Sequence, residues 1–149
     1  MREIGYLMTV SLLGECKMQS PLSIPFFLMR VSAGFPNPAQ DHIEKSLDLN
    51  ELCVKHPSAT YMVRVEGDSM MDAGIFHGDI LIVDRSLTAQ HDDIVIAELS
   101  GEMTVKQLQL RPRVRLVPKN KRYPVIEGLE IEDITIFGVV TNVIRALKE

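Results

Sequence analysis

The chain has 149 residues, 46% of them hydrophobic, and a formal net charge of −4. This length suits one domain with an appended arm, and it allows a core of useful size. The negative balance gives no global reason to expect tight nucleic-acid binding, which depends on basic side chains that neutralise phosphates. The two cysteines, Cys16 and Cys53, lack Cys-x-x-Cys spacing, which favours a reducing cytoplasm over a disulfide scaffold.

Residues 1–23 show no firm periodicity, so we expect a loosely held arm. The apolar residues 5–13 follow Arg2, as in a signal peptide, but Glu3 lies in the part that would have to be basic. Glu15 then stands where a signal peptide needs a small residue. No run approaches the roughly 20 apolar residues that span a bilayer. The sequence therefore favours a cytoplasmic protein without a membrane segment.

Residues 24–38 are predicted to form an exposed, extended joint. Residues 24–31 are apolar and extended in character, and the small residues Ser-Ala-Gly follow at 32–34. Pro36 and Pro38 lack backbone donors and push the residues before them away from helical backbone angles. An exposed segment of this kind is one that a protease can hold.

Residues 39–56 are the most helical stretch of the sequence. Apolar residues recur near helical spacing at Ile43, Leu47, Leu49 or Leu52, and Cys53. Pro57 stops the run. Asp48 is predicted to cap a second short helix, because Glu51 follows it by three positions.

From residue 60 onward the sequence predicts strands. The expected strands are residues 60–65, 79–84, 93–99, 102–110, 114–118 and 135–146. Glycine-containing turns at residues 100–101 and 127–128 separate some of them. Many short strands with close turns indicate a mostly β fold, a partly closed barrel or sandwich, with one or two short helices and a flexible N-terminal arm.

A nucleophile and a base can be placed on this framework. Ser69 lies in a turn after a predicted strand, in the run Gly-Asp-Ser-Met at 67–70. Strand alternation puts Lys106 on the same face as Thr104 and Leu108, where desolvation would lower the pKa of the amine toward neutrality. A neutral amine can deprotonate a serine. Periodicity alone does not pair them, since such a serine is more often a turn residue and such a lysine more often reaches solvent.

These motifs resemble the LexA-type self-cleaving serine peptidases. Residues 67–70 are similar to their nucleophile motif, and residues 104–106 to their base strand. The interval of 37 residues between Ser69 and Lys106 is that of the family. Residues 33–34, Ala-Gly, resemble its self-cleavage site and lie 35 positions before the serine.

Three further runs, at residues 56–61, 78–84 and 106–112, resemble the UmuD branch of that family. That branch is the accessory subunit of an SOS-induced translesion DNA polymerase, polymerase V. The resemblance covers roughly residues 24–146. It implies the signal-peptidase-like β fold of the family and no cofactor.

The resemblance also implies a mechanism. Ser69 would attack the carbonyl of Ala33, while neutral Lys106 takes the hydroxyl proton and later gives it to the leaving amine of Gly34. The backbone N–H groups of Asp68 and Ser69 are the candidates for an oxyanion hole. Cleavage would separate an N-terminal arm, residues 1–33, from a peptidase-like β domain, residues 34–149.

The partners implied are those of the UmuD branch. A RecA–single-stranded DNA filament stimulates cleavage, and the trimmed form dimerises and joins the catalytic subunit of an error-prone, Y-family translesion polymerase. Only 33 residues precede Gly34, too few for the helix-turn-helix domain of a LexA repressor, so no sequence-specific DNA binding is expected.

Three alternatives stay open. One is a dimeric interaction module that does not cleave itself, and another is a transcriptional repressor of the LexA or phage type. The third is a signal-peptidase-like enzyme, which the lack of an apolar anchor disfavours.

Some features lie outside the resemblance. Residues 92–93, Asp-Asp, replace the His/Gly-Asp turn of the branch, and residues 111–122 are locally basic, which we interpret as a solvated strand face rather than a partner or DNA surface. The four histidines have no ligand-like spacing, so a metal site is not expected. His77 or His91 could serve a Ser–His–Asp triad, but neither accompanies a nucleophile elbow.

Overall fold

A computed structural model of the protein describes residues 9–15, 23–27 and 43–148. Strands dominate the described chain, and the short 3₁₀ turns carry the label η. The elements in order are β1 (Thr9–Glu15), β2 (Ser23–Phe27), β3 (Ile43–Asp48), α1 (Leu49–Cys53), η3 (Pro57–Ala59), β4 (Thr60–Glu66), η4 (Met71–Ala73), β5 (Ile80–Asp84), β6 (Ile94–Leu99), β7 (Glu102–Gln109), β8 (Arg115–Val117), η5 (Ile131–Asp133) and β9 (Thr135–Ile144).

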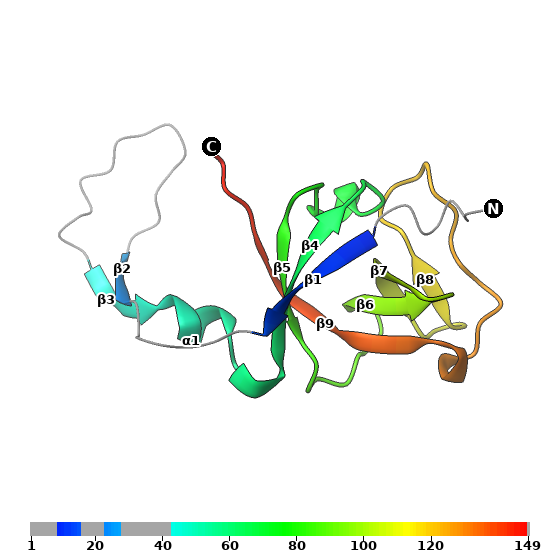
Figure 1. Ribbon diagram of the computed structural model, residues 1–149, viewed down its shortest axis with the longest axis horizontal. Coiled ribbons are helices and arrows are strands. Elements are labelled where there is room, and N and C mark those ends of the chain that lie inside the picture. Colours follow the sequence, from blue (N-terminus) through cyan, green and yellow to red (C-terminus); the bar gives the residue numbers. More distant parts are fainter. Residues whose placement is uncertain (1–8, 16–22, 28–42, 149) are drawn as a thin grey trace.

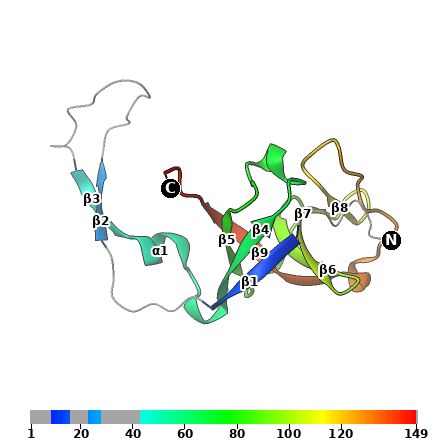
Figure 2. The ribbon, with the colours of Figure 1, turned by 45° about the horizontal axis from the view of Figure 1, so that its top comes forward.

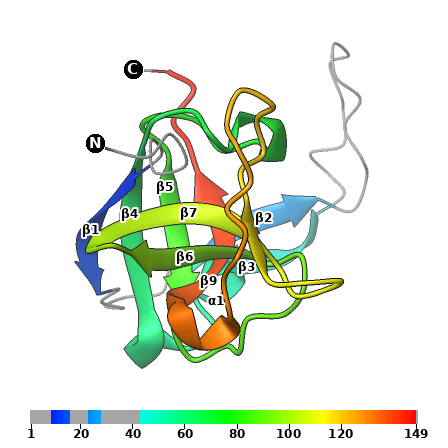
Figure 3. The ribbon, with the colours of Figure 1, turned by 90° about the vertical axis from the view of Figure 1, so that its right-hand side faces the viewer.

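Six strands close into a barrel in the order β1-β4-β5-β9-β6-β7, and Thr9 of β1 pairs with Thr104 of β7 to complete the ring. All described pairings are antiparallel, and β8 adds to the outer side of β7. Figure 3 shows β6 and β7 crossing in front of β4 and β5. The prediction of a mostly β, barrel-like fold is confirmed.

A second, two-stranded sheet pairs β2 with β3. This sheet and α1 lie at one end of the molecule, apart from the barrel (Figures 1 and 2). The chain between its two strands contains residues 28–42, and these lie outside the described residues. Ala33 and Gly34, and therefore the predicted boundary between arm and β domain, fall in that part of the chain.

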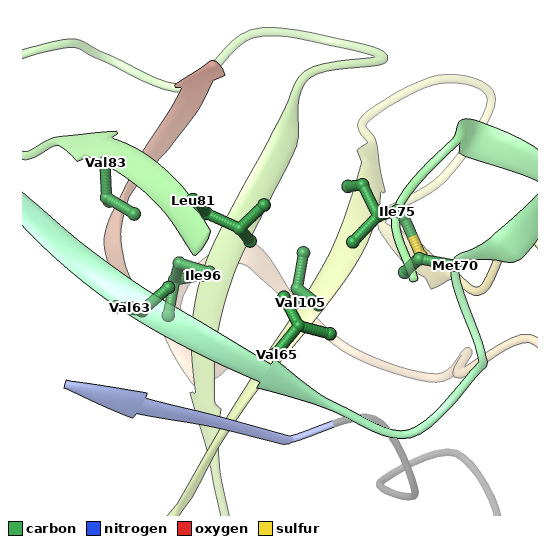
Figure 4. Packing of buried hydrophobic residues seen from close by; sticks show 8 residues of the cluster. All are labelled: Val63, Val65, Met70, Ile75, Leu81, Val83, Ile96 and Val105. Carbon is green, nitrogen blue, oxygen red and sulfur yellow. The ribbon is translucent and has the colours of Figure 1, made fainter. Parts of the chain in front are cut away.

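The main core lies between β4, β5, β6 and β7, together with the turn after β4. Its fully or nearly fully buried members are Val63, Val65, Met70, Ile75, Leu81, Val83, Ile96 and Val105 (Figure 4). The period-two pattern of β4 explains its face, since Val63 and Val65 are buried whereas Arg64 between them is exposed. Burying each such aliphatic side chain stabilises the fold by about 1.5–3 kcal/mol relative to leaving it in water.

A second cluster covers the other face of β6 and β7. Ile96 belongs to the main core, whereas its neighbours Val95 and Ala97 pack with Leu108 and Leu116 in the second cluster. Strand β6 is therefore buried on both faces over residues 95–97, which explains the apolar run at 94–97 that precedes the exposed Glu98. Lys106 of β7 lies in this doubly covered region, opposite Val95 in the strand register.

The first difference from the sequence prediction concerns residues 1–23. Residues Thr9–Glu15 are not part of a loose arm, because they form β1 and pair with β4 from Thr9↔Glu66 to Glu15↔Tyr61. This strand gives backbone partners to edges of β4 and β7 that would otherwise be unpaired. Its sequence signal is weak because Leu12 and Leu13 are both about half exposed and the register shifts before Gly14.

The second difference concerns residues 39–56. Ile43–Asp48 form strand β3, and helix α1 spans only Leu49–Cys53. Helical spacing of apolar residues is a weak signal over so short a run, and backbone pairing with β2 outweighs it. The predicted cap is present, since the Asp48 side chain accepts a hydrogen bond from the Asn50 N–H at 3.0 Å. Within the described residues, no helix is long and apolar enough to cross a membrane.

Candidate active site

The turn that carries Ser69 joins β4 to η4. Gly67 has a φ of 100°, in a region that side chains disfavour, so this position favours glycine. Met70 follows the serine, and its side chain is fully buried in the main core beside Ile75 (Figure 4). Ser69 is itself fully buried. The turn is therefore fixed at one end by the strand and at the other by the methionine.

Strand β7 brings Lys106 to this turn. Lys106 is fully buried, as are Thr104 and Val105. Alternation along the strand places Thr104 and Lys106 on one face and Val105, a member of the main core, on the other. Gln107 on the second face is partly exposed, but at Val105 the strand is buried on both faces.

The lysine amine contacts the serine hydroxyl. Lys106 Nζ lies 3.1 Å from Ser69 Oγ, 2.8 Å from Thr104 Oγ1 and 3.1 Å from the Val105 carbonyl oxygen. Desolvation by burial lowers the pKa of Lys106 from 10.5 to about 7. No carboxylate of the described residues forms an ion pair with this amine. The neutral and charged forms of Lys106 are therefore nearly balanced at neutral pH.

The three oxygen neighbours suit both protonation states of the amine. An ammonium group has three N–H donors, one for each oxygen. A neutral amine has two N–H donors and one lone pair, so it can donate to Thr104 and Val105 and accept from the hydroxyl of Ser69. A proton can thus pass from Ser69 Oγ to Lys106 Nζ without any rearrangement of the heavy atoms.

The candidate oxyanion donors lie in the same turn. The backbone N–H groups of Asp68 and Ser69 donate no hydrogen bond to another described residue. The carbonyl oxygen of Asp68 accepts a hydrogen bond from Asn120 Nδ2 at 2.9 Å, and its carboxylate accepts one from the hydroxyl of Tyr123. Asn120 and Tyr123 carry no local sequence signal for this role, because they lie 52 and 55 residues from Asp68.

Neither His77 nor His91, the two candidate triad histidines, has a hydrogen bond to Ser69 within the described residues. His77 Nδ1 accepts a hydrogen bond from the Gly67 N–H at 3.2 Å, and His91 Nδ1 accepts one from the Leu110 N–H at 2.9 Å. Both rings thus hold loop backbone, which gives no support to a Ser–His–Asp triad. Within the part of the chain that is described, no group of three or more His, Cys, Asp or Glu side chains could hold a metal ion.

The two remaining sequence features are residues 92–93 and the basic stretch 111–122. Asp92 takes a positive φ of 72°, and the Asp93 carboxylate accepts a hydrogen bond from the Gln90 N–H, so these residues build a turn. The basic stretch does not form one strand face as expected. Only Arg115 of its six basic residues lies in β8, and it is half-buried against Gln109.

A closed antiparallel barrel with a buried serine hydroxyl against a lysine amine is the arrangement of a peptidase-like β-barrel protein. A family profile described as Peptidase S24-like matches residues 25–141, which is most of the chain. The chain belongs to this family.

Several curated proteins are similar to this chain over most of its length. Protein MucA of Salmonella typhimurium is 55% identical over 121 residues, which cover 80% of this chain and 83% of that protein. Protein ImpA of Shigella flexneri is 51% identical over 84% of this chain and 86% of its own. The LexA repressor of Ectopseudomonas mendocina is 42% identical over 78% of this chain, but only 57% of the repressor is covered.

Proposed function

We propose that the protein is a serine peptidase that cuts its own chain between Ala33 and Gly34, with Ser69 as nucleophile and Lys106 as general base. The observation that carries this proposal is the buried contact of 3.1 Å between Ser69 Oγ and Lys106 Nζ. A lysine with a pKa of about 7 is a base suited to neutral or mildly alkaline conditions. Membership of the Peptidase S24-like family supports the same reaction class.

In the first step Ser69 Oγ bonds to the carbonyl carbon of Ala33 while its proton moves to Lys106 Nζ. The amine of Gly34 then leaves with that proton, and an ester joins Ser69 to Ala33. In the second step Lys106 takes a proton from water, whose oxygen attacks the ester. The released serine regains its proton, and the products are residues 1–33 and residues 34–149.

The developing oxyanion needs donors that are already in place. The backbone N–H groups of Asp68 and Ser69 are our candidates, because neither donates to another described residue. Thr104 also holds the amine, since its hydroxyl oxygen accepts a hydrogen bond from Lys106 Nζ at 2.8 Å. The dyad itself requires no cofactor.

We further propose that the cleaved protein is an SOS mutagenesis subunit. The proposal rests on the similarity to the UmuD branch and on the extent of the match to MucA and ImpA, which covers more than four fifths of each relative. A RecA–single-stranded DNA filament would stimulate cleavage in the cytoplasm by favouring the state in which residues 33–34 occupy the site. Residues 34–149 would then dimerise and join the catalytic subunit of a Y-family translesion polymerase.

The experiment is incubation of the purified full-length chain at pH 9, and separately at pH 7.5 with RecA filament. Ser69→Ala and Lys106→Ala should each abolish cleavage, whereas the matched controls Ser58→Ala and Lys148→Ala, both at exposed positions, should cleave as the wild type does. Cleavage in either dyad variant would refute the mechanism. An intact wild type under both conditions would favour an interaction module, and sequence-specific duplex binding would favour a repressor.

A further inference from the structure

The loop between β8 and η5 is fastened to the turn that carries the serine. The Asp72 N–H donates to the Lys119 carbonyl at 2.7 Å, and Asn120 Nδ2 donates to the Asp68 carbonyl at 2.9 Å. The Tyr123 hydroxyl donates to the Asp68 carboxylate. Figure 3 shows this yellow-to-orange segment rising beside the green turn of η4. These contacts hold the residue directly before Ser69 by its main chain and by its side chain.

The amide of Asn120 has a fixed orientation. Its Oδ1 accepts a hydrogen bond from the Arg122 N–H at 3.0 Å, while its Nδ2 donates to the Asp68 carbonyl oxygen. The Asn120 carbonyl also accepts from the Tyr123 N–H at 3.1 Å. A rotated amide would place an oxygen against the Asp68 carbonyl and an NH₂ group against an N–H, so both contacts would be lost. Asn120 is thus anchored within its own loop while its side chain also binds the turn that carries Ser69.

We infer that Asn120 positions the oxyanion hole. The Asp68–Ser69 peptide is planar and trans, so the N–H of Ser69 points opposite to the C=O of Asp68. A donor that fixes this carbonyl therefore also fixes the direction of the Ser69 N–H. The same hydrogen bond polarises the peptide and makes that N–H a stronger donor. The inference rests on the proposed peptidase function, and it makes Asn120 a positioning residue rather than a catalytic one.

Tyr123 supports the same peptide from the side chain of Asp68. The hydrogen bond to the Asp68 carboxylate makes the largest contribution to raising the pKa of Tyr123. The phenol therefore keeps its proton and acts as the donor. Arg122 adds little, since its side chain is 78% exposed and lies 3.8 Å from the carboxylate. Asn120 is the sharper test because it holds the peptide itself.

Two variants separate positioning from a purely structural role. Asn120→Ala removes both hydrogen bonds of the amide. Asn120→Asp keeps an oxygen for the Arg122 N–H but removes the Asn120 donor, so the Asp68 carbonyl keeps only the longer hydrogen bond of 3.4 Å from the Met71 N–H. Lys121→Ala is the matched control, because it changes an exposed side chain in the same loop.

The first readout is the single-turnover rate of self-cleavage of the full chain between pH 6 and pH 9. Both Asn120 variants should lower the plateau rate by about 10- to 100-fold, the range expected when catalytic donors are slightly misplaced. The midpoint pH should stay unchanged in Asn120→Ala, because this change adds no charge and leaves the contacts of Lys106 intact. Wild-type rates in both variants, or a shifted midpoint in Asn120→Ala, would overturn the inference while leaving the dyad in place.

The second readout does not depend on cleavage. The NMR order parameter of the Ser69 N–H, measured at pH 6, should be about 0.85 in the wild type and in Lys121→Ala, and below about 0.6 in Asn120→Ala. An unchanged order parameter in Asn120→Ala would refute positioning even if the rate had fallen. If the wild type does not cleave, the proposed function fails, and this measurement still decides whether Asn120 orients the peptide.

Discussion

Replacing the buried lysine by methionine should make the protein more stable at low pH and remove a large part of its pH dependence. The comparison is between Ser69→Ala and the double variant Ser69→Ala with Lys106→Met, so that no cleavage intervenes. Methionine has a similar length and no charge. The lysine carries a desolvation cost when it is protonated, and the methionine does not.

The magnitude follows from the pKa. The pKa of Lys106 is about 7 in the folded chain, against an ordinary value of 10.5. Between these values the unfolded chain binds more protons, so the unfolding free energy rises with pH in this window. Each unit of pKa difference corresponds to about 1.4 kcal/mol, which gives a rise of about 3 kcal/mol between pH 6 and pH 9. No discount for solvent screening is needed because Lys106 is fully buried.

Urea unfolding at pH 6, 7, 8 and 9 measures this difference. The unfolding free energy of Ser69→Ala should rise with pH by about 3 kcal/mol more than that of the double variant. Other groups titrate equally in both proteins, so their contribution cancels. Parallel pH profiles would show that the amine is already solvated or remains charged, and they would refute the argument for a neutral base.

The remaining predictions address the reaction and the barrel. The rate of self-cleavage should rise through a midpoint near pH 7, the pKa of Lys106, and a midpoint above pH 9 would contradict this. Thr104→Val, which removes an acceptor of the ammonium form, should lower the plateau rate about tenfold and move the midpoint to lower pH. Gly138→Ala should cost about 1–3 kcal/mol in urea unfolding, because the added Cβ would lie 2.6 Å from a side-chain carbon of β5. Arg145→Ala should lower the free energy of unfolding in urea at pH 7, because it leaves the buried Asp79 carboxylate without its two hydrogen bonds from the guanidinium. That loss should shrink as pH falls well below 3.8, since Arg145 lowers the pKa of Asp79 and its contribution vanishes once the carboxylate is protonated.

The part of the fold after residue 60 could be predicted because its signals are local. Strands such as β5 and β6 combine an apolar run rich in β-branched residues with a turn at the end, and burial on one or both faces repeats the pattern. Strand β1 could not be predicted in this way. Its leucines are half exposed, and what holds it is backbone pairing with strands that lie far away in the sequence.

The candidate site likewise has one part that could be predicted from the sequence and another part that could not. Strand phase alone places Lys106 on an apolar face, and the structure finds it fully buried. The contact between Lys106 and Ser69 spans 37 residues, so only resemblance to a family could pair them before the fold was known. The hydrogen bonds of Asn120 and Tyr123 to Asp68 span even longer separations between two loops, and loop conformation carries no periodic signal.

Intact-mass spectrometry of the full-length chain, after incubation with RecA filament, tests self-cleavage most directly. We predict two products in the wild type, one that ends at Ala33 and one that begins at Gly34. Ser69→Ala should give neither product under the same conditions. A wild-type chain that stays whole, or a fragment that begins at another residue, would contradict the proposed reaction.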